Sequence, residues 1–315
     1  MPNGIPSHDT FNRVCKFLDA KAFGECLYRW SGEFLASLQH HQVAIDRDAC
    51  RGKVLRASAR SGHKKSGICV VSAWVSDHRL VLGQQRVEGK SNEKQAIPEL
   101  LDSLDLTGAI VTIDAVACQV SVARQIRAKQ AHYLLALKQN QRRASPKHLY
   151  QQVWSQLLAR QAQLPRQSEL QTGGGRFEKR TAYVLEDLTW VEPLADWPGV
   201  KSVVRSWLRV AKNGIITQEN RLCLTSLEAN PLFILELTRG HWGIENKLHW
   251  QLDVAFREDQ QRVRVGNGAD NMAPLRKLAL QVLHQAQHQE SIKTRRKMAA
   301  WSNPYLVRLL TKLRF

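Results

Sequence analysis

Residues 109–138 read AIVTIDAVACQVSVARQIRAKQAHYLLALK, and this stretch decides the fold that the sequence predicts. AIVTID is a continuous apolar run ending in Asp114, as expected of a buried strand. Residues 119–130 have helical spacing, and HYLLALK, residues 132–138, is a second apolar run. A strand, a helix and a strand in succession are typical of α/β proteins, in which helices pack on the faces of a sheet.

The preceding residues predict more of the same sheet. VAID, residues 43–46, is a short apolar run, and residues 67–89 contain two β-rich runs that predict a hairpin. Residues 91–106 predict a helix with Ser91 as its N-cap. We therefore expect residues 43–140 to form a mixed sheet flanked by helices.

The chain outside this sheet predicts three further regions. Residues 9–37 favour helix, and the middle region contains alternating, tryptophan-bearing β segments that we interpret as an insertion. The last region begins at Asn230-Pro231, an N-cap and first-turn proline, and its final predicted helix covers residues 273–287. The apolar face expected for the first region is Phe11, Val14, Phe17 and Leu18. The expected divisions are a helical N-terminal remnant, the first part of the sheet domain, the β-rich insertion and a helical C-terminal part: 1–40, 41–145, 146–230 and 231–315.

The composition favours a nucleic-acid partner. The 315 residues are 43% hydrophobic, enough for one large domain or two smaller ones. Lysine and arginine exceed aspartate and glutamate by 18 along the whole chain, which favours an extended DNA-binding face over the alternative of a solvated basic surface. No apolar run spans a membrane, no signal-peptide core is present, and the six cysteines show no CxxC spacing. We expect a cytoplasmic, nucleoid-associated protein with reduced cysteines and no membrane partner, and leave a homodimer open.

Two aspartates occupy comparable positions in the predicted sheet. Asp46 ends the VAID strand and Asp114 ends the AIVTID strand. Because neighbouring strand ends lie about 5 Å apart, both carboxylates could point into one crevice at the sheet edge. The alternative for each aspartate is a turn or a helix cap.

A third carboxylate comes from residues 239–259, RGHWGIENKLHWQLDVAFRED. Helical spacing predicts one polar and one apolar stripe side by side. The polar stripe is His241, Glu245, His249 and Asp253, and the apolar stripe is Ile244, Leu248, Leu252 and Phe256. The two histidines with Asp253 could instead hold zinc, although HExxH is absent.

Asp46, Asp114 and Glu245 together predict a site for hard cations. Three carboxylates repel one another at a core edge, and Mg²⁺ or Mn²⁺ relieves that repulsion through oxygen ligands. Two such ions about 4 Å apart activate the attacking oxygen and stabilise the leaving oxygen of a phosphodiester. These three residues therefore predict metal-dependent cleavage of DNA. Other sets of acidic residues in the sequence could be combined in the same way.

Several long motifs resemble one family of enzymes. NGIPSHDTFNRV, KSNEKQAIPELLDSLDLTGAIVTIDAVACQ, YLLALKQNQ and HWGIENKLHWQLDVAFRED occur in this order. Together they resemble the H-repeat-associated, ISAs-type insertion-sequence transposases, which are DDE transposases with an RNase H-like catalytic fold. The resemblance covers nearly the whole chain. It implies that Asp46, Asp114 and Glu245 are the catalytic metal ligands, and that the β-rich middle is the insertion before the glutamate helix.

The resemblance also implies a reaction and a partner. The expected reaction is hydrolysis of phosphodiesters in double-stranded DNA at element ends, followed by strand transfer into a target by the freed 3′-hydroxyl. A decayed, DNA-binding remnant and a structure-selective nuclease are the alternatives. Lys53, Arg239, Lys247, Arg262 and Arg264 are candidate phosphate contacts, with a solvated surface as the alternative for each. Trp242 and Trp250 favour packing over base stacking, and Cys118 favours packing over nucleophilic chemistry.

The sequence departs from the family pattern in four places. RDACR, residues 47–51, separates Asp46 from a Gly-Lys pair that follows it directly in the family. Residues 174–176 are Gly-Gly-Arg where His-Gly-Arg is usual, and residues 116–117 are Val-Ala where Met-Gly is usual. The sequence starts at NGIPSHDT, so most of the family's N-terminal domain is absent, and we expect weak recognition of element ends.

Overall fold

The computed structural model divides by its contacts into two compact units. Unit 1 comprises Met1–Ser37, Asp46–Leu104 and Gly243–Phe315, and unit 2 comprises Leu38–Ile45 and Asp105–Trp242. The residues that the structure describes are 6–33, 35, 37–47, 69–87, 93–137, 149–173, 175–191, 194–228, 230–261, 263, 265–286 and 289–311. Ser91, Lys53, Arg262 and Arg264, which the sequence singled out, lie outside the described residues.

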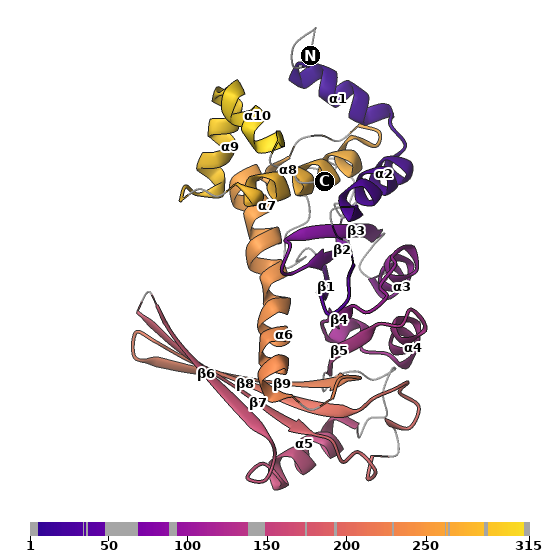
Figure 1. Ribbon diagram of the computed structural model, residues 1–315, viewed down its shortest axis with the longest axis vertical. Helices are drawn as coiled ribbons and strands as arrows, with labels where there is room; N and C mark the ends of the chain where they lie inside the picture. Colours follow the sequence, from indigo (N-terminus) through magenta and orange to yellow (C-terminus); the bar gives the residue numbers. More distant parts are fainter. Residues whose placement is uncertain are drawn as a thin grey trace, which may run out of the picture. The chain divides into compact units, whose positions relative to one another are not determined.

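The sheet of unit 2 is mixed and runs in the order β1-β4-β5-β9-β8-β7-β6 (Figure 1). Strands β1, β4 and β5 are parallel, and the remaining neighbours are antiparallel. The parallel strands are continuous apolar runs, as buried parallel strands require. The bounds are β1 (Gln42–Arg47, in unit 2 as far as Ile45), β4 (Ile110–Ile113), β5 (His132–Leu137), β6 (Arg166–Gly173), β7 (Arg176–Leu185), β8 (Ser202–Lys212) and β9 (Ile215–Thr225).

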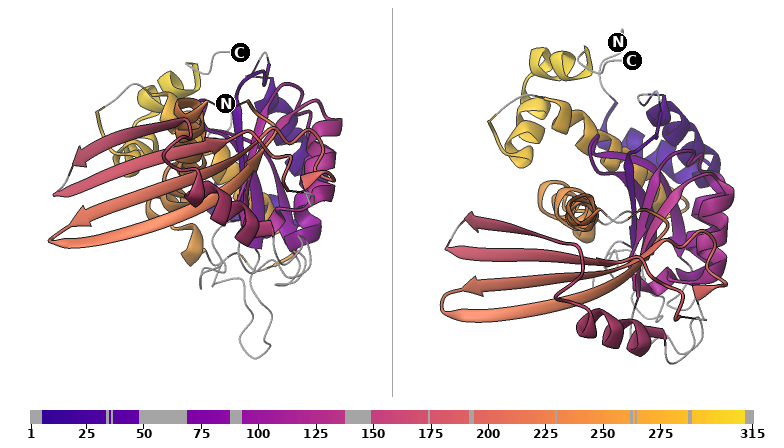
Figure 2. Two further views of the ribbon diagram at one scale, coloured as in Figure 1. Left: turned by 90° about the horizontal axis from the view of Figure 1, so that it is seen from below. Right: turned by 60° about the horizontal axis from the view of Figure 1, so that its bottom comes forward.

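Helices cover both faces of this sheet. α4 (Val120–Ala128) packs against β5, while α5 (Leu149–Ala159) and α6 (Pro231–Gly243) lie on opposite faces of β6–β9 (Figure 2). The predicted N-cap of α6 is confirmed, because Asn230 Oδ1 accepts the N–H of Phe233 at 3.1 Å. The core under α6 consists of Ile110, Leu134, Ala182, Val184, Val204, Cys223, Ile234, Leu235 and Leu237.

Unit 1 combines a hairpin with most of the helices. The predicted hairpin is confirmed: β2 (Cys69–Val75) pairs antiparallel with β3 (Leu80–Val87), with an irregularity after Ala73. α8 (Gly268–Gln285) bonds to both strands, because Lys277 Nζ donates to Ser72 Oγ at 2.7 Å and to Gln84 Oε1 at 2.6 Å. The other helices are α1 (His8–Phe17), α2 (Ala20–Gly32), α3 (Glu93–Ser103), α7 (Trp250–Phe256), α9 (Ile292–Trp301) and α10 (Asn303–Thr311).

The face predicted for the N-terminal helix is wrong. Phe11, Val14 and Phe17 are 46%, 50% and 73% exposed, whereas Cys15 on the other side of α1 is 2% exposed. The buried side of α1 meets α8 through polar contacts, since the Asn271 side-chain amide donates to the Cys15 carbonyl at 2.8 Å. These backbone bonds decide which face of the helix is covered, and apolar spacing does not report them.

The sequence did not predict three elements, which are β6, α9 and α10. β6 is exposed along almost its whole length, so it lacks the alternation that marks a half-buried strand. The helix expected over 273–287 corresponds to α8, which ends at Gln285, but it is not the last, because α9 and α10 follow it. The basic sequence of α9 conceals its apolar positions, although Ser291 caps it by accepting the Thr294 N–H at 3.2 Å.

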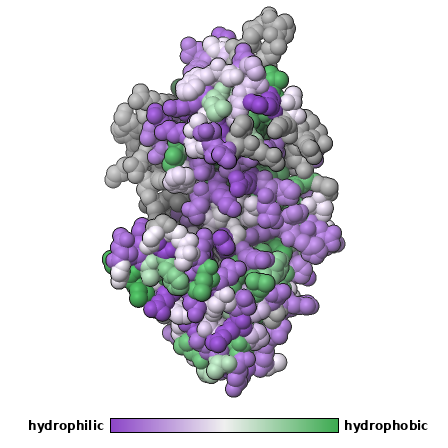
Figure 3. Space-filling model, turned by 60° about the vertical axis from the view of Figure 1, so that its left-hand side comes forward, coloured by the Kyte–Doolittle hydropathy of each residue, from purple (hydrophilic) through white to green (hydrophobic). Residues whose placement is uncertain are grey.

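Hydrophilic residues predominate on the face shown in Figure 3, with hydrophobic ones in small patches among them. In the described part of the chain, every helix is too short or too polar to cross a membrane.

Candidate active site

Asp46 lies at the end of β1 beside a buried histidine of unit 1. Its Oδ1 accepts the backbone N–H of Arg47 at 2.8 Å, and its Oδ2 lies 3.9 Å from Nδ1 of His249. The side chains of Asp46 and His249 are only 18% and 6% exposed. The structure therefore brings together two of the polar residues that the sequence singled out.

Glu245 lies in a π-helical segment, Ile244–His249, that follows α6 directly and leads into α7. The N–H of Trp250 bonds to the carbonyl of Glu245, five residues back. Such a turn holds more residues than an α-helical turn, so regular helical spacing does not predict the exposure of every position in it. Glu245 is exposed and His249 is buried, so the single polar stripe predicted from helical spacing is wrong at this point.

The apolar stripe beside Glu245 is confirmed for the most part. Ile244, Leu248 and Leu252 are at most 2% exposed. Gly243, the first residue of this part of unit 1, lies close to the β2 strand of the same unit, because a Cβ there would lie 3.0 Å from the Trp74 ring. The buried side chains of Ile244 and Leu248, before and after Glu245, fix the backbone that carries this exposed carboxylate.

Asp114 lies at the end of β4 in unit 2. Ile113, the residue before it, is the register partner of Ile45 on the parallel strand β1. Thr112 is two residues before Asp114 and therefore on the same face of β4. Asp114 then precedes a short 3-10 turn, Ala115–Ala117, so it also has the helix-cap position that was its alternative interpretation.

A buried polar network holds α6 against β1 and β4 on this face. The Gln42 side-chain amide donates to Thr112 Oγ1 at 3.0 Å and to the Leu237 carbonyl at 2.7 Å. Thr112 Oγ1 is also hydrogen-bonded to His241 Nδ1 at 3.0 Å. Gly240 leaves room for Gln42, since a Cβ there would overlap with Gln42 Oε1. This contact explains why position 240 has no side chain.

His241 is kept neutral by this environment. The pKa of its imidazole is lowered from 6.5 to about 4, mainly by burial; the negative charge of Asp114 opposes this shift and the positive charge of Arg221 adds to it. A neutral imidazole both donates and accepts a hydrogen bond, which suits a network of uncharged partners. Sequence reasoning missed Gln42, Thr112 and Arg221. Gln42 and Thr112 could have been identified as polar side chains beside or inside an apolar strand sequence.

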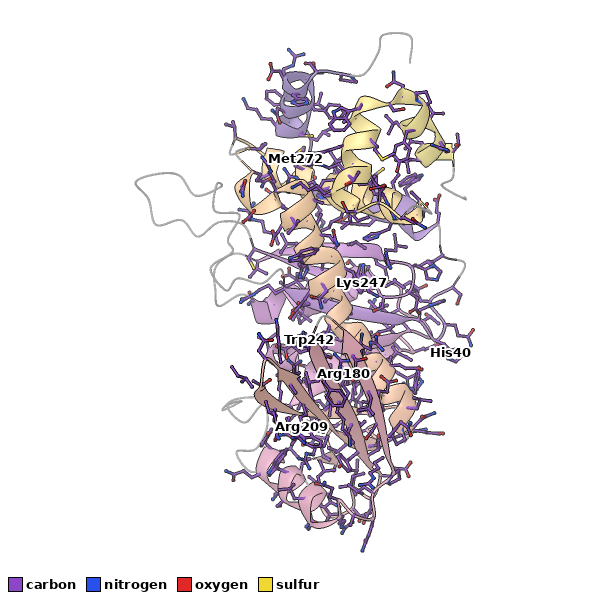
Figure 4. The ribbon with its side chains drawn as sticks, turned by 90° about the vertical axis from the view of Figure 1, so that its left-hand side faces the viewer. His40, Arg180, Arg209, Trp242, Lys247 and Met272 are labelled. Atoms are coloured by element: carbon purple, nitrogen blue, oxygen red, sulfur yellow. The ribbon has the colours of Figure 1, made fainter. Side chains whose placement is uncertain are left out.

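The candidate phosphate contacts and tryptophans have distinct environments, and Lys247 and Trp242 are labelled in Figure 4. Arg239 is 54% exposed, with Nη1 3.8 Å from Glu169 Oε2 and Nη2 bonded to Gln171 Oε1 at 3.3 Å. Lys247 is exposed on the π-helical segment. Trp250 is 53% exposed, so its packing interpretation is wrong.

Cys118 is buried, and burial raises the pKa of its thiol, which agrees with packing. Within the described ranges no three side chains of His, Cys, Asp or Glu gather as a metal site, and the zinc alternative gains no support.

Similarity to known proteins extends over most of the chain. The family model described as "Transposase DDE domain" matches residues 39–282. YncI of Escherichia coli O157:H7, a transposase by name, is 33% identical over 314 residues, which cover 98% of this chain and 78% of that protein. YhhI of E. coli strain K12, an H repeat-associated transposase by name, is 31% identical over 322 residues, which cover 98% of this chain and 81% of that protein.

A solved synaptic complex of the piggyBac transposase with hairpin DNA is also similar. The similarity has a TM-score of 0.39 and 11% identity, over 86% of this chain and 54% of that chain, which is too slight to support an argument.

Proposed function

The chain belongs to the DDE transposase family, as its motifs predicted, and on that premise we propose that it cuts DNA and joins the cut strand to a target in a metal-dependent reaction. Asp46, Asp114 and Glu245 are the proposed metal ligands. The substrate is double-stranded DNA at element ends and at the target, and the protein acts in the cytoplasm at the nucleoid.

The observation that carries this proposal is the register of β1 and β4. Ile45 and Ile113 are partners on adjacent parallel strands, and the next residue of each strand is an aspartate. Adjacent strands are about 4.8 Å apart, so two carboxylates that follow paired residues are well placed to share an ion. An RNase H-like core agrees with the parallel strands β1, β4 and β5 and with the β2–β3 hairpin between the first two in the chain.

The chemistry of these donors fits the metal that the family implies. All three side chains offer oxygen, and Mg²⁺ is usually held by one or two protein carboxylates together with water and substrate phosphate. The pair at the strand ends meets that need without a third close protein ligand. When bound, the metal polarises phosphoryl oxygens and activates the attacking water or hydroxyl.

The chain's own residues then have separate tasks. Asp46 lies against buried His249, which limits the rotamers open to the carboxylate. The Gln42, Thr112 and His241 network fixes α6 over the face of β4 that carries Asp114. The basic surplus of the chain neutralises DNA phosphates and supplies the binding energy.

Substitution of the carboxylates tests the proposal. Asp114→Asn and Glu245→Gln are expected to lower Mg²⁺-dependent nicking of plasmid DNA by about a thousandfold, about 4 kcal/mol in transition-state free energy. Asp196→Asn and Glu236→Gln are the matched controls, because both carboxylates are exposed in unit 2 and lie outside the proposed site. Calorimetric titration with Mn²⁺ should show weaker binding for the two test variants alone. Equal nicking by the test variants and the parent would remove the assignment.

A DNA-binding protein without catalysis is the second candidate. It is favoured by the finding that, within the described residues, no three candidate ligands gather as a metal site. DNA binding by the parent without nicking in Mg²⁺ or Mn²⁺ would establish this second function. Nicking without joining of donor to target DNA would identify a nuclease instead.

A further inference from the structure

Arg221 on β9 has an unusually fixed guanidinium group. The group lies over the ring of Trp242 at 4.1 Å from the centroid, and its Nε donates to Glu219 Oε1 at 2.7 Å. The side chain remains 34% exposed. A stacked and tethered arginine loses little conformational freedom when it binds a ligand, which makes binding more favourable.

Strand register places Arg221 on the same face of the sheet as Asp114. Ile113 pairs with Leu135, so Asp114 continues the row that holds Ala136 and its partner Cys223. Arg221 is two residues before Cys223 and therefore points to the same side of β9. α6 covers that side, because Cys223 packs in the core with Ile234 and Leu237 of the helix.

Electrostatic effects agree with this placement. Burial has the largest effect on the pKa of His241 and lowers it. Asp114 raises this pKa, and Arg221 lowers it. The same two residues act in opposite directions on the buried thiol of Cys223. A carboxylate and a guanidinium therefore lie within electrostatic range of the same buried groups.

One edge of the guanidinium is available to a ligand. Stacking occupies its plane and Glu219 occupies Nε, while the terminal Nη1 and Nη2 donate to no residue that the structure describes. A planar guanidinium with two parallel donors matches the two oxygens of a phosphate. The candidate ligand is therefore a phosphodiester of the DNA backbone.

We propose that Arg221, held on Trp242, binds a backbone phosphate of DNA beside Asp114. The proposal rests on the function proposed above and adds to it a contact that positions the substrate. Two strand spacings, about 10 Å, separate β4 from β9. Arg221 thus contacts a phosphate near the reacting one and aligns the strand for the carboxylates.

Binding measurements without metal test this contact independently of cleavage. The probe is a fluorescein-labelled duplex of about 30 base pairs in EDTA, titrated at salt concentrations from roughly 50 to 200 mM. Arg221→Gln is expected to lower affinity about tenfold and to reduce the salt dependence by about one phosphate contact. Arg221→Lys keeps the charge, so it should keep the salt dependence while losing affinity through the lost fork and stacking.

Arg209→Gln is the matched control. Arg209 is labelled in Figure 4 and is exposed on β8 of the same sheet. The register of β8 and β9 places it on the opposite face from Arg221. We expect less than about a twofold change in its affinity, since one unaligned surface charge contributes little. An Arg221→Gln variant that binds like the parent, or no worse than Arg209→Gln, would overturn the proposal.

Two further measurements separate binding from structure and test location. If Arg221 served only to pack Trp242, Arg221→Gln would lower the melting temperature and leave the salt dependence unchanged, which contradicts the proposal. Asp114→Asn should raise DNA affinity, and its combination with Arg221→Gln should be non-additive if both residues face neighbouring phosphates. Additivity would refute the placement beside Asp114. Absence of nicking in the parent would refute the proposed function and leave the phosphate contact standing.

Discussion

The pair His-Trp occurs twice within one motif, and its two copies have different surroundings. His241 is bonded to the neutral side chain of Thr112, and Trp242 carries the guanidinium of Arg221. His249 instead faces the carboxylate of Asp46 at 3.9 Å, and Trp250 is 53% exposed. In unit 2 the first copy thus fixes α6 on the sheet, and in unit 1 the second copy lies beside Asp46, a candidate metal ligand. The strands that each copy meets decide its role.

The two copies also differ in the helix that carries them. The first lies in α6, where Gly240 admits Gln42 between helix and strand. The second lies at the end of the π-helical segment, and Gly243, which precedes this segment, leaves room for the Trp74 ring. A hydrogen-bonded network supports the first copy, and apolar packing supports the second. Substitutions at the two glycines and at the histidines can therefore separate polar from apolar support.

The largest effect on stability is expected from Gly240→Ala. The new Cβ overlaps with Gln42 Oε1, so Gln42 must leave its bonds with Thr112 and Leu237, and buried polar groups lose their partners. The cost is about 2–4 kcal/mol, reduced by about 1 kcal/mol because alanine favours helix over glycine. A thermal melt should show a decrease of several degrees, at about 2–4 °C per kcal/mol.

Gly243→Ala is the matched substitution at the start of the π-helical segment that leads to the second copy. Its Cβ would lie 3.0 Å from the Trp74 ring, a contact that a small shift relieves without breaking any hydrogen bond of the Gln42 network. We expect a net cost of about 1 kcal/mol or less. If Gly243→Ala lowers the melting temperature as much as Gly240→Ala, apolar packing holds this helix more strongly than the polar network does.

Protonation of His241 is expected to destabilise the polar network as the pH falls. Because its folded pKa is about 4 against 6.5 for the unfolded chain, the unfolded state binds more protons between these values. This contribution to stability is complete above pH 6.5 and is lost as the pH falls toward 4. The loss is at most on the order of 3 kcal/mol at pH 4. Melting temperatures at intervals across this range should fall in the parent and fall less in His241→Asn.

His284 in unit 1 supplies the comparison for that experiment. Burial lowers the pKa of its imidazole to about 4, and nearby Arg79, bonded to its Nδ1 at 2.7 Å, acts in the same direction. Because both imidazoles are half-buried and have a pKa of about 4, His284→Asn should remove a share of the pH dependence similar to that of His241→Asn. A parent protein whose melting temperature is flat from pH 6.5 to 4 would contradict both assignments.

These contrasts show what the sequence could predict. The elements between residues 43 and 137 were predicted in the right order, because their apolar runs are continuous and their burial is local. The roles of Gln42 and Thr112 were not, since each depends on a partner on α6 that is far away in the chain. The π-helical segment was also missed, because helical spacing assumes one turn length throughout. The three candidate ligands came from motifs, and their shared site stays a prediction.

The smallest effect on stability is expected from Arg239→Gln, two residues before the first copy. Its ion pair with Glu169 is 3.8 Å long and both side chains are partly exposed, so its loss should cost less than about 0.5 kcal/mol. The melting temperature should therefore change by no more than about 1–2 °C. If Arg239 also contacts a DNA phosphate, the same variant should bind duplex DNA a few times more weakly, with a lower salt dependence.

Glu169→Gln tests the same ion pair from its acidic side. Removing the acidic partner frees Arg239 while keeping the length of the side chain, so a phosphate contact should become stronger and DNA affinity should rise. If the pair is only a surface ion pair, both variants should bind DNA like the parent. Opposite changes in affinity, at nearly constant melting temperature, would therefore assign Arg239 to the DNA-binding surface and separate its role from that of the buried network next to it.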